Sequence, residues 1–158
     1  MKTVMSLPTK ILAGGSMAFQ SHLVLVNQIE LEQMRFAIAR GALPVDFEHK
    51  LRRIAAESLN GRFIEQQCRW FAALLIAVQS GQFRGVDNDR FQQLMRVLAY
   101  VRKEDDAIPD YQVKGLADDQ HEVRLVVVEM QVLIAGFKDW WLRSRVPVAW
   151  NQPVAFAI

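Results

Sequence analysis

Residues 62–80, RFIEQQCRWFAALLIAVQS, constrain the fold of this chain more than any other segment. Their apolar side chains recur at helical spacing and surround much of the circumference of the helix that they would form. A helix of this kind is stable in water only when other helices cover it on several sides. The chain shows no sustained alternation of apolar and polar residues, which is the pattern typical of strands. The sequence therefore predicts an all-α fold of about five helices packed around a central one.

Apolar residues at spacings of three and four predict two helices before this central segment. The first is expected over residues 21–40, with Gly41 ending it in a left-handed conformation. The second is expected over residues 46–59, with Asp46 as its N-cap and a break at Asn60-Gly61. Both helices would be amphipathic and would cover the central one.

Two further helices are expected after the central segment. One spans about residues 88–103, with Asp87 or Asn88 as its N-cap. The other opens at Asp118-Asp119 and reaches Arg143, because its apolar period and its length outweigh the low helix propensity of its valines. The two helices would flank an acidic turn.

The chain is expected to form one domain with a C-terminal tail. Its 158 residues suit a single hydrophobic core, which we assign to residues 1–145. Residues 146–158 contain two prolines and almost no charge, so they are expected to form an extended apolar tail. A soluble monomer rarely exposes such a segment. We therefore expect the tail to dock on a neighbour through Trp150, Phe156 and Ile158.

The sequence also predicts where the chain resides. Its longest apolar run, residues 70–78, is far shorter than the roughly 20 residues that a membrane-spanning helix needs. Pro8 and Lys10 interrupt what would be the apolar region of a signal peptide. The single cysteine, Cys68, suits a reducing compartment. We expect a cytoplasmic protein without a transmembrane helix.

Seven carboxylates crowd into residues 103–122, against two basic side chains. Asp118 and Asp119 are expected to open the last helix, and Asp119 with Glu122 forms a pattern similar to a capping box. Two interpretations stay open. The acids cap the helix and pair with arginines, or some of them bind Mg²⁺ or Ca²⁺, for which clustered carboxylates are suitable ligands. The candidate ligands are Asp106, Asp110, Asp118 and Asp119.

The run DDAIPDYQVKGLADD, residues 105–119, resembles the signature of the YkvA-like domain family, whose function is unknown. The second proline common in that turn is replaced here, and the approach to the motif differs. The resemblance implies a helical hairpin over about residues 88–143 with a rigid acidic elbow, and it implies no particular reaction. It suggests association with membranes or larger assemblies. The positions that match the signature are Asp106, Ile108, Pro109, Asp110, Gly115, Asp118 and Asp119.

Candidates for nucleophilic or zinc chemistry are few. Cys68 lies amid apolar residues of the central helix, so we expect core packing and a disfavoured thiolate. His22, His49 and His121 are isolated from one another along the chain, and zinc is not expected. The sequence favours a role without catalysis.

The function that we expect is that of a non-catalytic helical interaction or assembly protein, a subunit or adaptor without a cofactor. It would bind a protein partner or associate with itself. A divalent-cation-dependent protein and a nucleic-acid-binding protein are the alternatives, and peripheral membrane contact by the tail stays open. The arginines that would face nucleic acid are Arg52, Arg53, Arg62 and Arg69.

Overall fold

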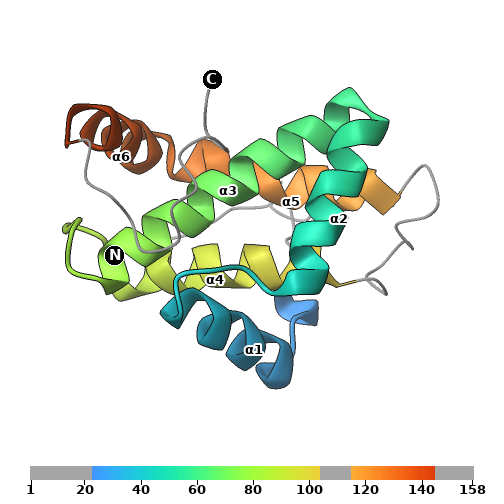
Figure 1. Ribbon diagram of the computed structural model, residues 1–158, viewed down its shortest axis with the longest axis horizontal. Coiled ribbons are helices and arrows are strands. Elements are labelled where there is room, and N and C mark those ends of the chain that lie inside the picture. The colour runs from blue at the N-terminus through green and yellow to red at the C-terminus, as the bar shows by residue number, and fades with distance from the viewer. Residues whose placement is uncertain (1–22, 104–114, 145–158) are drawn as a thin grey trace, which may run out of the picture.

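The computed structural model describes residues 23–103 and 115–144, which form six α-helices and one short 3₁₀ helix (Figure 1). These ranges contain no strand, so the predicted all-α fold class is confirmed. None of their helices is long and apolar enough to cross a membrane. The elements in chain order are η2 (Leu23–Leu25), α1 (Gln28–Ala39), α2 (Val45–Glu57), α3 (Leu59–Gln79), α4 (Asn88–Arg102), α5 (Gly115–Glu129) and α6 (Gln131–Ser144).

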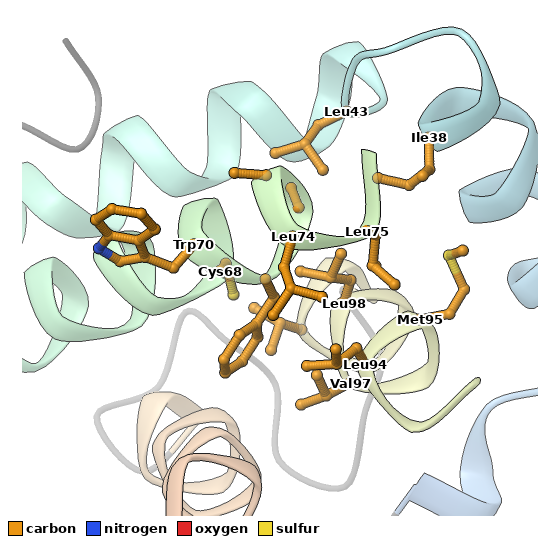
Figure 2. Close-up of a cluster of buried hydrophobic side chains, with 14 of the residues drawn as sticks. Ile38, Leu43, Cys68, Trp70, Leu74, Leu75, Leu94, Met95, Val97 and Leu98 are labelled. Carbon is orange, nitrogen blue, oxygen red and sulfur yellow. The ribbon is translucent and has the colours of Figure 1, made fainter. Parts of the chain in front are cut away.

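Helix α3 is the central element, as its sequence predicts. It packs against α1, α2, α4 and α5. Every residue from Cys68 to Ala77 is buried, so a stretch of nearly three turns has no face left for water. Burying each large apolar side chain contributes roughly 1.5–3 kcal/mol relative to exposure. Figure 2 shows side chains of α3 gathered with those of α4 and of the α1 region: Ile38, Leu43, Leu74, Leu75, Leu94, Met95 and Leu98.

The N-terminal ends of α4, α1 and α2 can be compared with the N-caps and helix starts that the sequence predicts. Asp87 caps α4 as expected, because its side chain accepts a hydrogen bond from the backbone N–H of Arg90. The predicted start of the first helix at Ser21 is too early: Asn27 is extended and forms a capping box with Glu30, so α1 begins after it. The prediction of Asp46 as an N-cap is wrong, because α2 already starts at Val45 after Pro44.

The boundary between α2 and α3 differs from the predicted break at Asn60-Gly61. The chain leaves helical geometry at Ser58, whose hydroxyl accepts a hydrogen bond from the N–H of Gly61 at 2.9 Å. Gly61 therefore lies inside the first turn of α3. It permits a close approach of the two helices, because a methyl group at this position would overlap the carbonyl oxygen of Ile54. The glycine serves helix packing here and does not form a turn.

The last predicted helix, residues 118–143, is two helices in the structure. It begins earlier, at Gly115, and divides at the buried residue Met130. Helix α6 then packs its aromatic face against Trp70 in the middle of α3 and against Phe83 in the loop that follows α3. The ring of Phe137 lies 6.1 Å from that of Trp70 and 5.1 Å from that of Phe83, both edge to face. Aromatic pairs in this geometry contribute roughly 0.5–1.5 kcal/mol beyond their burial.

Substituting Gly61→Ala should destabilise the fold. The added methyl group overlaps the Ile54 carbonyl, and overpacking of this kind costs about 1–3 kcal/mol. The control is Gly136→Ala in α6, where the new methyl group meets open space and the better helix propensity of alanine should stabilise by up to about 1 kcal/mol. Urea unfolding followed by circular dichroism measures both. Equal stability of the two variants would contradict the close α2–α3 approach.

Candidate functional site

The four aspartates that the sequence nominated as cation ligands are only partly described. Asp106 and Asp110 lie outside the described residues, whereas Asp118 and Asp119 lie in the first part of α5. Among residues 23–103 and 115–144, no group of three His, Cys, Asp or Glu side chains could hold a metal ion. The cation site therefore stays a prediction that depends on the two aspartates outside these ranges.

Asp119 does not cap α5, because the helix starts four residues earlier, and its side chain instead meets a buried lysine. The ammonium group of Lys50, from α2, lies 3.4 Å from Asp119 Oδ2, and both side chains are almost completely buried. Lys50 Nζ also donates hydrogen bonds to the carbonyl oxygens of Val101 and Lys103. The capping-box interpretation of Asp119 and Glu122 is wrong for this reason.

Lys50 ties three helices together at one point. The last carbonyl groups of α4 lack partners within their own helix and carry partial negative charge, which a cation neutralises. The same ammonium group neutralises Asp119 at the beginning of α5, so it links both sides of the acidic stretch to α2. The sequence predicted Asp119 as a residue that opens the last helix and did not indicate Lys50 as its partner. A signal existed, because Lys50 falls on the buried face of α2 with Phe47, Leu51 and Ile54.

Cys68 lies near this ion pair and is fully buried, as expected for a core residue. Burial raises the pKa of its thiol well above the usual range, and the negative charge of Asp119 raises the pKa further, although Lys50 opposes this. A thiol nucleophile needs to be an accessible thiolate. The surroundings of Cys68 give the opposite: a protonated, enclosed thiol.

The four arginines nominated for nucleic-acid binding occupy different environments. Arg69 is buried, and its guanidinium binds both oxygens of Glu48 at 3.0–3.1 Å and Glu65 at 2.9 Å. Burial alone would lower the pKa of Arg69, but the hydrogen bonds to the two carboxylates outweigh this effect and raise it. Its donors are thus used inside the protein. Three exposed arginines remain for the nucleic-acid alternative: Arg52, Arg53 and Arg62.

An apolar surface that sequence analysis did not nominate runs along the outer side of α1 and onto the start of α2. Ile29 is 69% exposed, Phe36 is 64% exposed and Val45 is 72% exposed. Arg40 places its guanidinium 5.2 Å from the centre of the Phe36 ring. We define the α1 surface as these residues together with the polar side chains between them: Ile29, Glu32, Gln33, Phe36, Arg40 and Val45.

Two grooves lie on the α1 surface. The first has a volume of about 370 Å³ and follows α1 between Ile29 and Phe36. The second, of about 340 Å³, lies between α1 and α2 and is lined by Phe36, Leu43 and Val45 among others. Both grooves share Phe36 and Gln33, so they are adjacent. Figure 1 shows α1 at the edge of the molecule, beside α4.

Comparison with known proteins supplies no relative. The chain matches no family model, no curated protein and no solved structure. The YkvA-like resemblance therefore stays a prediction from residues 105–119. What the protein does has to be inferred from its own residues.

Removing the buried ammonium group should be costly. Lys50→Met leaves Asp119 buried beside the carbonyl groups of α4, and loss of one member of a buried ion pair costs about 3–5 kcal/mol. Urea unfolding measures the loss. Arg143→Met is the control, because it breaks the exposed pair with Asp139, which is worth at most about 1 kcal/mol. The double variant Lys50→Met with Asp119→Leu should recover part of the stability, and no recovery would contradict direct coupling between the two residues.

Iodoacetamide should distinguish the native from the unfolded thiol. Cys68 should react at least about a thousandfold more slowly in the native protein, because reaction requires unfolding and a typical domain is stable by 5 kcal/mol or more. The control carries Cys68→Ala with Ala39→Cys, which moves the thiol to an exposed position of α1. Its labelling rate should hardly depend on folding. Rapid labelling of native Cys68 would show that the centre of α3 is accessible.

Proposed function

We propose that this protein is a non-catalytic interaction protein, a subunit or adaptor that binds a protein partner through the α1 surface. The observation that carries the proposal is the exposure of Ile29, Phe36 and Val45 along two adjacent grooves that share Phe36. Exposed apolar patches of this kind mark sites of interaction in soluble proteins. The proposal moves the interface from the predicted tail to α1.

The composition of the α1 surface fits a protein partner. Protein interfaces combine an apolar and aromatic centre with a polar rim, and arginine is enriched in them. Here Phe36 and Ile29 form the apolar part, and Glu32, Gln33 and Arg40 surround it. A guanidinium over an aromatic ring, as in Arg40 over Phe36, presents both kinds of contact at once.

The predicted docking of the tail through Trp150, Phe156 and Ile158 concerns residues outside the described ranges and is a separate proposal. The two alternative functions have less support. A cation site would need Asp106 and Asp110, and a nucleic-acid site would start with Arg52, Arg53 and Arg62 but without Arg69, whose donors bind Glu48 and Glu65.

Cross-linking with quantitative mass spectrometry tests the proposal. The tagged full-length protein is cross-linked in cell extract, and the yields of its cross-linked species are compared among the wild type, Ile29→Lys and Phe36→Lys. Each substitution puts a charge at the centre of the apolar surface, and losing the burial of one such side chain should lower the yield on the order of tenfold.

Leu59→Lys is the matched control, because Leu59 is also exposed but begins α3, away from the α1 surface. Its cross-linked species should equal those of the wild type. Identical patterns for all four proteins would overturn the proposal that α1 forms the interface.

A further inference from the structure

Glu32 and Arg40, two charged residues of α1 and its C-cap, are placed symmetrically about Phe36. Glu32 lies four residues before it and Arg40 four residues after it, so both are about one turn away, on the same side of the helix. Ile29 lies seven residues before it, and beyond the end of α1 at Ala39 the second groove is lined by Leu43 and Val45. A pattern of this kind is complementary to its own antiparallel copy.

We propose that the partner of the α1 surface is a second copy of this chain, bound in an antiparallel two-fold dimer centred on Phe36. This inference rests on the proposed interaction function and names the partner. A two-fold interface uses the same patch on both subunits, so the patch must supply both members of each contact. The α1 surface does so in shape and in charge.

The shape argument concerns Ile29 and the groove between α1 and α2. In the proposed dimer Ile29 of one subunit lies beyond Arg40 of the other, at the C-terminal end of its α1, where the groove of about 340 Å³ is lined by Phe36, Leu43 and Val45. A projecting apolar side chain thus meets an apolar hollow twice, once on each side of the axis. Residues 29, 33, 36 and 40 also follow the alternating spacing of four and three residues by which paired helices pack.

The charge argument concerns Glu32 and Arg40. Both hydrogen bonds of Glu32, from Gln28 and from Arg35, end on Oε2, so Oε1 can accept from a partner. Arg40 makes no ion pair with a residue of the described ranges, and its guanidinium lies over the ring of Phe36, towards the proposed axis. The antiparallel arrangement brings Arg40 of each subunit to Glu32 of the other. The dimer thereby gives the cation a carboxylate that the monomer lacks within these ranges.

A charge exchange between Glu32 and Arg40 tests this inference. Sedimentation velocity over a concentration series gives the dimer dissociation constant for the full-length wild type, for Glu32→Arg and for Arg40→Glu. The wild type should sediment at twice 18.1 kDa when concentrated. Each single variant places like charges opposite one another twice and should raise the dissociation constant at least about tenfold.

The two single variants mixed together provide the decisive measurement. One chain then carries arginine at positions 32 and 40 and the other carries glutamate at both, so the mixed dimer restores both opposite-charge pairs. We expect the mixture to dimerise as tightly as the wild type. The matched control Glu57→Arg makes the same chemical change at an exposed position of α2 and should leave the constant unchanged.

The outcomes separate this inference from the proposed function. A wild type that stays monomeric at all concentrations overturns the second copy as partner. If Ile29→Lys still removes cross-links to another protein, the interaction function stands with that protein as partner. If no cross-link depends on Ile29, both the interaction function and the dimer are overturned. Two results would overturn the antiparallel arrangement about Phe36. Either the dissociation constants of the single variants equal that of the wild type, or mixing the two variants does not restore tight dimers.

Discussion

The structure depends on the burial of α3. Between Cys68 and Ala77 this helix has no side that can face water, so the surrounding helices must enclose it for the chain to be stable. This requirement explains why α2 and α3 approach so closely that only glycine fits at position 61. It also explains why α6 turns its aromatic face towards Trp70 in the middle of α3.

Enclosing α3 brings polar groups into the interior, where each of them needs a partner. Lys50 lies on the side of α2 that faces the core, and it meets the free carbonyl groups of α4 and the carboxylate of Asp119. At least one of the carboxylates at the start of α5 therefore has a structural role. Asp119 belongs to the core, where it is fully buried.

The α1 surface is a consequence of the same packing. Helix α1 has enough apolar residues for more than one face, and it turns Leu31, Met34 and Ile38 towards the core. Ile29 and Phe36 are left outside, with charged residues placed symmetrically around Phe36. A helix that completes the core and still exposes large apolar side chains has a second surface to cover, and the antiparallel dimer that we propose would cover it with the same residues of another chain.

The sequence by itself determined the all-α class, the central place of residues 62–80, the burial of Cys68 and an N-cap at Asp87 or Asn88, because periodicity and capping are local properties. It did not determine the division at Met130, the role of Gly61, the partner of Asp119 or the exposed side of α1. Each of these depends on which side chains meet across distant segments. Lys50 and Asp119 lie 69 residues apart, and only the packing of α2 and α5 against α4 brings their charges together.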